Sequence, residues 1–311
     1  MLARALGYGA AHVLRGLRAC NRRGGRGGIA GRHGGDGPPV VLLHGHPRTH
    51  ATWHRVAALL ADRYTVVCPD LRGYGGSTVP PDAADHAQAS KRAMAGDVVA
   101  LLDALGHPRF ALAGHDRGGY AAFRAAMDHP ERIAALTTFG RAVPILETLE
   151  RMGVRFAREW WHWFFLGQTS KPAEEVIAAI GPDDWYRTHG PEVMGAEAHD
   201  DVWAALRNPA VVHGMCEDYR AGLTIDAEHD RADRAAGRRV RCPVQSVWAA
   251  RDDPDLFGPD PLAVLRGWTE DLRGAGIDSG HHVAEEAPEA TAAALAGFWA
   301  EVGWTTRSLR G

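Results

Sequence analysis

Apolar and polar positions follow a regular pattern from residue 39 onward. Short, almost wholly apolar runs predict strands buried on both faces of a sheet, and longer stretches with helical spacing lie between them. Strands that alternate with helices in this order predict an α/β fold with a mostly parallel, doubly wound sheet. The predicted strands are residues 40–43, 64–68, 110–113 and 133–139, and the predicted helices are residues 53–60, 93–105 and a stretch ending near residue 128.

The alternation stops after residue 144. From there to about residue 235 the chain has helical spacing, many aromatic side chains and no good strand pattern. Strand patterns return at 244–249 and, more weakly, near 275–278, and a helix is predicted near 291–298. One sheet interrupted by helices predicts a core with an inserted cap, and pockets between the cap and the carboxyl ends of the strands. The predicted division is a first core part at 37–144, a helical cap at 145–235 and a second core part at 236–311.

The N-terminal segment, residues 1–36, does not share this pattern. Its first part carries arginines and is weakly amphipathic, and glycine dominates from Gly24 to Gly37. This composition predicts a poorly ordered segment. A transit peptide or a membrane-surface helix is the alternative, whereas a secretory signal would need an apolar core that is missing. No run reaches the ~18 apolar residues that a membrane span needs, and we expect a soluble, cytoplasmic protein.

Composition narrows the possible functions. The 311-residue chain has a formal net charge of −3 at pH 7, which gives no indication of a nucleic-acid or membrane partner. Its four cysteines are far apart and form no CxxC pair, so the sequence indicates neither a zinc site nor a disulfide framework. We therefore expect no metal, no cofactor and a small-molecule substrate.

The turn after the third predicted strand carries the strongest chemical signal. Gly114-His-Asp-Arg-Gly118 matches the nucleophile elbow G-x-S-x-G of the α/β-hydrolase fold, with Asp116 in place of the serine. A carboxylate is already ionised at neutral pH, and it attacks a tetrahedral carbon that bears a leaving group, such as a halide or an epoxide oxygen. This attack gives an ester that water must hydrolyse, which excludes ordinary serine esterase chemistry. The alternative interpretation is that Asp116 only caps the following helix.

Two further segments follow in the order that this fold requires. The loop His44-Gly-His-Pro47 would supply one amide of an oxyanion hole, that of His46, beside the amide of Arg117. Only the backbone of His46 is needed, and its side chain is expected to be exposed. The base of the fold is a histidine after the last strand. We predict His281 for this role, with His282 packing against the core beside it.

Together these residues resemble the haloacetate dehalogenases, which include the fluoroacetate dehalogenases, within the aspartate-nucleophile α/β-hydrolases. The likeness runs from about residue 38 to residue 288. Beyond the elbow it rests on the segments 64–77, 90–94, 161–165 and 218–222. The resemblance implies that His162, Trp163 and Tyr219 bind the leaving halide, that Arg117 holds the substrate carboxylate, and that the protein is a homodimer. Packing of a cap helix on the core is the alternative for the aromatic run.

The chain departs from the family pattern at three places. The family usually has a second carboxylate-binding arginine where Tyr120 stands. The acid that orients the histidine is expected at Arg141, and an arginine cannot accept a hydrogen bond. We therefore predict Asp252, after the next core strand, as the acid, with Asp253 as the alternative, although a solvated acidic loop is also possible. The strand hairpin that usually begins the family fold is not recognisable.

The leading hypothesis is a hydrolytic dehalogenase that acts on a small 2-haloacid, such as a haloacetate, through a covalent aspartyl ester. An epoxide hydrolase is the nearest alternative, but such enzymes use cap tyrosines to protonate the opening oxygen, and Tyr219 beside His162 and Trp163 fits that chemistry less well. A catalytically impaired binding protein is the third hypothesis, and Arg141 is the feature that favours it. Halide release from chloroacetate and fluoroacetate separates the three.

Overall fold

The computed structural model describes residues 18–24, 27–140, 144–187, 189–252, 260 and 262–305. These residues form one eight-stranded sheet in the order β1-β2-β4-β3-β5-β6-β7-β8. The strands from β3 to β8 pair in parallel, so the predicted α/β fold with a mostly parallel sheet is confirmed. The strands are β1 (Arg18–Gly24), β2 (Gly27–Gly34), β3 (Pro39–Leu43), β4 (Thr65–Pro69), β5 (Phe110–His115), β6 (Ile133–Phe139), β7 (Val244–Ala249) and β8 (Leu272–Ile277).

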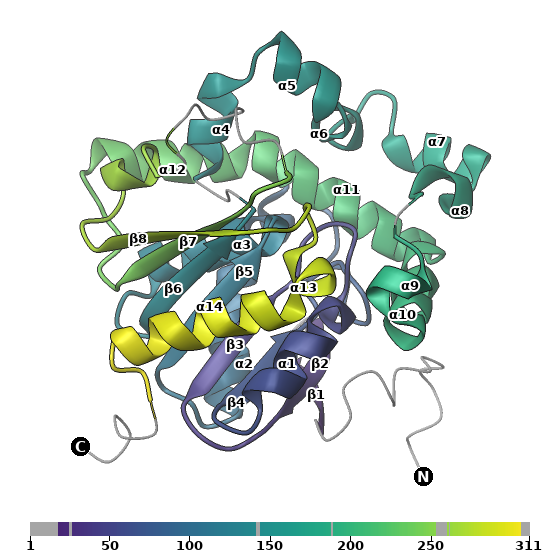
Figure 1. Cartoon of the computed structure of the whole chain (residues 1–311). Helices are drawn as coiled ribbons and strands as arrows, with labels where there is room; N and C mark the ends of the chain where they lie inside the picture. Colours follow the sequence, from purple (N-terminus) through teal and green to yellow (C-terminus); the bar gives the residue numbers. More distant parts are fainter. Residues whose placement is uncertain are drawn as a thin grey trace.

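Helices cover both faces of the sheet (Figure 1). On one face α1 (His54–Leu60) packs against α14 (Pro288–Glu301). On the other face α2 (Lys91–Ala104) packs against α3 (Arg117–Asp128). This two-sided cover explains why the central strands are apolar at most positions rather than at alternate positions.

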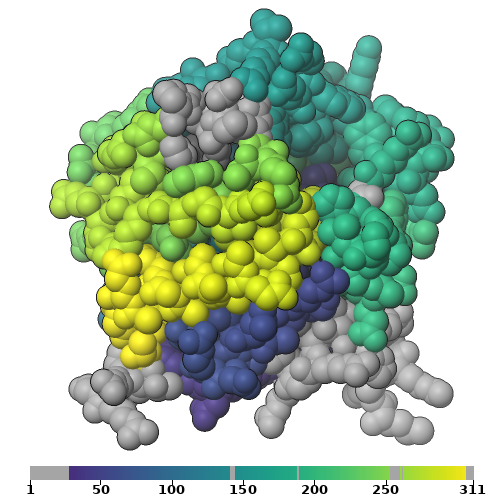
Figure 2. Space-filling view, viewed as in Figure 1, coloured from purple at the N-terminus to yellow at the C-terminus, as the bar shows by residue number. Residues whose placement is uncertain are grey.

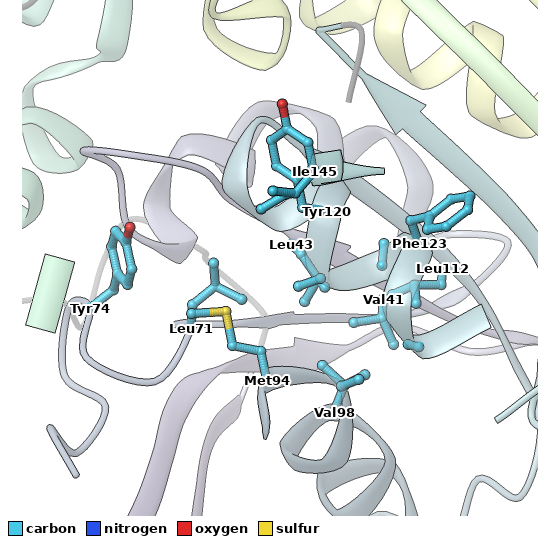
Figure 3. Packing of buried hydrophobic residues seen from close by; sticks show 14 of the residues in the cluster. Val41, Leu43, Leu71, Tyr74, Met94, Val98, Leu112, Tyr120, Phe123 and Ile145 are labelled. Carbon is cyan, nitrogen blue, oxygen red and sulfur yellow. The ribbon is translucent and has the colours of Figure 1, made fainter. Parts of the chain in front are cut away.

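Two apolar cores result, one on each face. Alternate residues of a strand point to opposite sides, so Val40 and Leu42 of β3 lie in one core whereas Val41 and Leu43 lie in the other. Figure 3 shows the second core, in which Val41 and Leu43 lie near Val98 of α2. Both cores are fully buried, and they fix the carboxyl ends of β3, β5 and β7 relative to one another.

A long helical segment separates β6 from β7 in the sequence. In Figure 1 the helices α5 and α6 form the top of the molecule, and α11 runs between them and the sheet. Figure 2 shows a hollow in the surface between these teal helices and the yellow C-terminal part. The helices are α4 (Ile145–Arg151), α5 (Val154–Glu159), α6 (His162–Leu166), α7 (Ala173–Ile180), α8 (Pro182–Trp185), α9 (Pro191–Met194), α10 (Ala196–Leu206), α11 (Pro209–Leu223) and α12 (Ile225–Ala235).

The remaining helices are short. They are α13 (Val283–Glu286), which lies between the last strand and α14, and the 3-10 turns η1 (His50–Trp53), η2 (Ala87–Ala89) and η3 (Leu265–Gly267). Among the described residues, no helix combines the length and the apolar character that crossing a membrane requires.

The N-terminal segment requires a correction. Residues 18–24 and 27–34, expected to be poorly ordered, form the antiparallel hairpin β1–β2, and β2 pairs with β4. The hairpin that the sequence analysis did not recognise is therefore present. Neighbouring residues supply its hydrogen bonds: the Ala30 amide donates to the Ser77 hydroxyl, and the Asp70 amide donates to the Ala30 carbonyl. A strand with little intrinsic propensity is thus held by the sheet beside it.

Candidate active site

The turn between β5 and α3 has the geometry of a nucleophile elbow. Asp116 has φ 51° and ψ −121°, a backbone conformation that a non-glycine residue adopts only under strain. A Cβ at Gly114 would lie 2.2 Å from the Gly118 carbonyl oxygen, and one at Gly118 would lie 2.3 Å from that of His44. Both flanking glycines are therefore required. The Asp116 side chain makes no capping hydrogen bond to α3, which argues against the helix-cap interpretation.

The His46 loop holds one oxygen of this carboxylate. The His46 backbone N–H donates to Asp116 Oδ1 at 2.9 Å. Burial by itself raises the pKa of Asp116, but the charges of His281, His115 and Arg117 and the His46 amide lower it overall below its ordinary value. The carboxyl group is therefore ionised at neutral pH, and Oδ2 is the oxygen that the His46 amide leaves uncovered.

The side chain of His46 differs from the expectation of an exposed residue. Its ring is half-buried and lies 5.2 Å from the Tyr219 ring and 5.8 Å from the Tyr186 ring, measured between centroids. Burial lowers its pKa to about 3, so the imidazole is neutral. Tyr186 and Tyr219 both belong to the helical segment between β6 and β7, and their contacts with His46 could not be foreseen from its position in the sequence.

The predicted base and acid lie in contact. The Nδ1–H of His281 donates to Asp252 Oδ2 at 2.8 Å. Burial alone would lower the pKa of His281, but the hydrogen bond and charge of Asp252, together with the charge of Asp116, raise it overall. Nε2 of His281 is left for a proton transfer. Asp253 and Arg141 lie outside the described residues.

Two carboxylates, the buried Glu285 and the partly exposed Glu286, fix the segments that carry these groups. Glu286 accepts the backbone amides of Gly280 and His282, at 2.6 and 3.1 Å, and so shapes the loop around His281. Glu285 accepts two hydrogen bonds from Arg48, at 2.7 and 3.0 Å. This bidentate pair ties the loop of His46 to the loop of His281.

The three groups that the resemblance assigns to the halide come from α6 and α11, two helices of the segment between β6 and β7. The Tyr219 ring lies 6.0 Å from that of His162 and 5.8 Å from that of Trp163, both nearly perpendicular to it. Burial lowers the pKa of His162 to about 4 and raises that of Tyr219 well above its ordinary value. Both side chains are therefore neutral at pH 7. With the Trp163 indole, the three side chains can each present an N–H or O–H donor.

Arg117 is fully buried, and most of its hydrogen-bonding capacity is already used. Its Nε and Nη2 each donate to the Asp218 carboxylate at 2.9 Å, and Nη2 also donates to the Asp218 carbonyl at 2.8 Å. Nη1 is buried with no hydrogen-bond partner among the described residues. The guanidinium carbon lies 4.2 Å from the centre of the Tyr219 ring. Nη1 is therefore the donor that Arg117 can offer to a substrate carboxylate.

Asp218 is the centre of a buried network that the sequence analysis missed. Besides Arg117 it binds the Lys91 ammonium and accepts a hydrogen bond from Tyr74, whose hydroxyl lies 2.7 Å away. The opposing charges of Arg117 and Lys91 hold the pKa of Asp218 well below its usual range against the effect of burial. Three of the segments that carry the resemblance, 64–77, 90–94 and 218–222, thus meet at one carboxylate. Lys91 is one of only two lysines in a chain whose other basic residues of this kind are arginines, and this was the available signal.

Gly222 ends the segment 218–222, and the structure explains why this position is a glycine. A Cβ at this position would lie 2.8 Å from Nη2 of Arg117. The close approach of helix α11 to the guanidinium therefore needs a residue without a side chain.

Tyr120 occupies the position of the second arginine of the family pattern. Its ring is buried beside Trp163, at 5.9 Å between ring centres, and Figure 3 shows its hydroxyl pointing away from the aliphatic core. Burial raises its pKa to about 12. Tyr120 can therefore offer a hydrogen bond but no positive charge to a bound anion.

Replacing Asp218 by asparagine tests how much this network contributes to the stability of the protein. The change leaves Lys91 and Arg117 without their shared counter-ion, and removal of one partner from a buried ion pair costs roughly 3–5 kcal/mol. We expect the free energy of unfolding in urea to fall by about that amount. Asp183→Asn, which breaks the exposed pair with Arg207, is the control and should change it little. Equal stabilities for the two variants would contradict this role of Asp218.

Comparisons with known proteins agree with this geometry. Residues 38–288 match the alpha/beta hydrolase fold family. The chain therefore belongs to this family, and it is a hydrolase.

The resemblance to the haloacetate dehalogenases is also confirmed. The chain is 41% identical to a fluoroacetate dehalogenase from Burkholderia sp. over 288 residues, which cover 85% of this chain and 88% of the relative. It is 28% identical to a soluble epoxide hydrolase from Corynebacterium sp. (strain C12), over 82% and 87% of the two chains. The structure of a putative epoxide hydrolase from Pseudomonas aeruginosa superposes with a TM-score of 0.85 at 38% identity, covering 93% of this chain and 97% of that one.

Proposed function

We propose that this protein is a hydrolytic dehalogenase that acts on a small 2-haloacid. The proposal rests on one group of side chains with neutral hydrogen-bond donors: the rings of His162 and Trp163 both pack against the ring of Tyr219. The charge of the ionised Asp116 acts on His162 and on Tyr219. Beside the Tyr219 ring, Nη1 of Arg117 has no hydrogen-bond partner among the described residues. A halide leaves as an anion, and converging donors stabilise the charge that develops on it. The similarity to a fluoroacetate dehalogenase over most of both chains supports the same reaction.

In the first step, Oδ2 of Asp116 attacks the carbon that bears the halogen. A C–O bond forms, the carbon–halogen bond breaks, and the halide leaves with the bonding electrons toward the three donors. Oδ1 stays on the His46 amide, which orients the carboxylate for attack. Nη1 of Arg117 holds the substrate carboxylate.

In the second step, water hydrolyses the ester. Nε2 of His281 takes a proton from a water molecule, whose oxygen attacks Cγ of Asp116. Negative charge develops on Oδ1, where the amides of His46 and Arg117 form the oxyanion hole. The bond between Cγ and Oδ2 of the ester breaks, and the imidazolium of His281 gives its proton to Oδ2, which leaves as the hydroxyl oxygen of a 2-hydroxyacid. The new carboxyl group, which contains Oδ1 and the oxygen of the water, releases its proton to solvent and is again a carboxylate. Asp252 stabilises the imidazolium through its hydrogen bond to Nδ1.

An epoxide hydrolase is the second candidate, because two of the similar proteins carry that name. The buried phenol of Tyr219 is protonated at neutral pH and could supply a proton to an epoxide oxygen. The third hypothesis, an impaired binding protein, loses its main support, because His281 has a carboxylate partner in Asp252.

Product analysis distinguishes the candidates. Purified protein is incubated separately with chloroacetate, fluoroacetate and styrene oxide, and free halide and diol are measured. We expect halide and the 2-hydroxyacid from the haloacids. Diol without halide would favour the epoxide hydrolase, and no product from any of the three would favour a binding protein.

The role of Asp252 has its own test. Without this carboxylate the His281 ring can adopt the wrong tautomer, and loss of such a partner slows hydrolases by roughly 10⁴-fold. We expect Asp252→Asn to reduce halide turnover on that scale and Arg141→Asp to change it little. Asp278→Asn, an exposed acid in the same region, is the matched control. A silent Asp252→Asn with a gain in Arg141→Asp would mean that the wild-type protein works without an acid partner for His281 and that an acid introduced at position 141 can supply one.

A further inference from the structure

Three histidines gather at the carboxyl ends of β5 and β8. His115 ends β5, and His281 and His282 follow β8. The rings of His115 and His281 lie 4.8 Å apart between centroids, those of His281 and His282 lie 5.0 Å apart, and those of His115 and His282 lie 5.9 Å apart. One nitrogen of each ring lies within 4.8 Å of one nitrogen of each of the others.

Two ring nitrogens of this cluster have unmet bonding capacity. Nε2 of His115 and Nδ1 of His282 are buried and have no hydrogen-bond partner among the described residues. A buried polar atom without a partner costs about 1–3 kcal/mol. In His281, Asp252 occupies Nδ1, so the ring offers Nε2. The proposed hydrolysis uses His281 but gives His115 and His282 no part.

We propose that His115, His281 and His282 together bind a divalent transition-metal ion such as Zn²⁺, and that this ion inhibits the enzyme. Three imidazole nitrogens are a common donor set for zinc, copper and nickel. Zinc–nitrogen bonds are about 2.0–2.1 Å long, so the three rings must each move inward by less than ~1 Å. Gly140, which has φ 71°, leaves room beside them, since a Cβ there would lie 3.3 Å from Nε2 of His115.

The surroundings favour a cation at this cluster. Asp252 accepts a hydrogen bond from Nδ1 of His281. In metal sites a carboxylate commonly binds the ring nitrogen that the metal does not occupy, and it thereby orients the metal-binding histidine. The charge of Asp116 acts on both His115 and His281. The positive charge of Arg48 disfavours a cation at His282. The two hydrogen bonds from Arg48 to the Glu285 carboxylate offset this charge. Burial lowers the pKa of His115 to about 4 and that of His282 well below its ordinary value, so their lone pairs are available at neutral pH.

The metal ion would bind Nε2 of His281, and inhibition follows from the catalytic role of this nitrogen. Nε2 of His281 is the nitrogen that accepts the proton of water in the second step. With a metal ion on it, Asp116 can still be alkylated, but the ester cannot be hydrolysed. This consequence rests on the proposed function, whereas the binding of the metal does not.

The binding test uses full-length protein freed of metals with a chelator. Zn²⁺ is titrated calorimetrically, and Co²⁺ is titrated by visible absorption, which reports the ligand geometry. We expect one equivalent of either metal to bind. His282→Asn should abolish this binding, with His282→Gln as a second variant if the first does not fold. Asp252→Asn should weaken the affinity by about 10–100-fold, the effect of losing such a supporting carboxylate.

His213→Asn is the matched control. His213 belongs to the other histidine-containing group with metal-binding spacing among the described residues, with Asp82 and Glu217. It already contacts Asp82 and Glu174, at 2.8 and 2.9 Å. Binding that survives His282→Asn but disappears in His213→Asn would overturn the proposal, and so would a wild-type protein that binds neither metal.

The inhibition test measures halide release and intact mass with Zn²⁺ and a haloacid present. We expect about one halide per active site, a stable adduct on the protein, and recovery of turnover when EDTA is added. Metal binding without inhibition would refute only the effect on catalysis. A protein that releases no halide even without metal would refute the proposed function, and the calorimetric result would still decide the metal site.

Discussion

Asp116→Asn is expected to abolish halide release. A neutral amide is a far poorer nucleophile than a carboxylate, and removal of the nucleophile of a hydrolase lowers turnover on the order of 10⁶-fold. The fold should remain, because asparagine tolerates a positive φ about as well as aspartate and its amide oxygen can still accept the His46 N–H.

Two measurements accompany this result. The circular dichroism spectrum of the variant should equal that of the wild type. Intact-mass spectrometry should show that the asparagine has not been hydrolysed back to aspartate during the assay. Wild-type turnover by a variant with the correct mass would remove Asp116 from the proposed mechanism.

His281→Asn is expected to stop the reaction after the first step, with the ester on Asp116 still intact. Asp116 needs no base to attack the substrate, but hydrolysis of the ester needs one. The variant should therefore release about one halide per site and keep the alkyl group as a mass increase on the peptide that contains Asp116. The structure sharpens this expectation, since Oδ1 of Asp116 is held by His46 and not by His281.

The control for this variant is His213→Asn, which removes a surface histidine and should turn over many times. Continued turnover in His281→Asn would mean that another group activates water. The rings of His115 and His282 lie nearest, at 4.8 and 5.0 Å from that of His281, and each would then be replaced in the same background.

The predicted elements of the central sheet agree well with the structure. The apolar runs at 133–139 and 244–249 coincide with β6 and β7. The weaker pattern near 275–278 corresponds to β8 at Leu272–Ile277. Strands that are buried on both faces need an apolar residue at almost every position, so their bounds are visible in the sequence, whereas β8 lies at the edge of the sheet and includes polar and glycine residues.

The N-terminal hairpin shows where such a pattern fails. Glycine and arginine between residues 18 and 34 carry no strand propensity. β2 nevertheless pairs with β4, with Gly31 opposite Pro69 and His33 opposite Val67. The backbone groups at the edge of the existing sheet determine this strand, and side-chain patterning contributes little.

The acid beside His281 was predicted from the sequence only in part. From the sequence we predicted Asp252, with Asp253 as the alternative and a solvated acidic loop as a further possibility. β7 and β8 are parallel neighbours with Ala249 opposite Ile277, and the pairing continues beyond the strands through the hydrogen bond between Arg251 and Ser279. Segments that leave adjacent parallel strands emerge at the same edge, which brings Asp252 to Nδ1 of His281.

The sequence alone determined the local features of this protein: the order of the strands from residue 39 onward, the elbow at Asp116 with its two glycines, and the histidine loop after the last strand. Each depends on residues that are neighbours in the chain, so spacing reveals it. Only the tertiary structure decided how Arg117 is held, because its partner Asp218 lies 101 residues away and Lys91 lies 127 residues from Asp218. Burial and pairing at such separations arise from the packing of helix α11 against residues of α2 and α3, and no local sequence pattern predicts them.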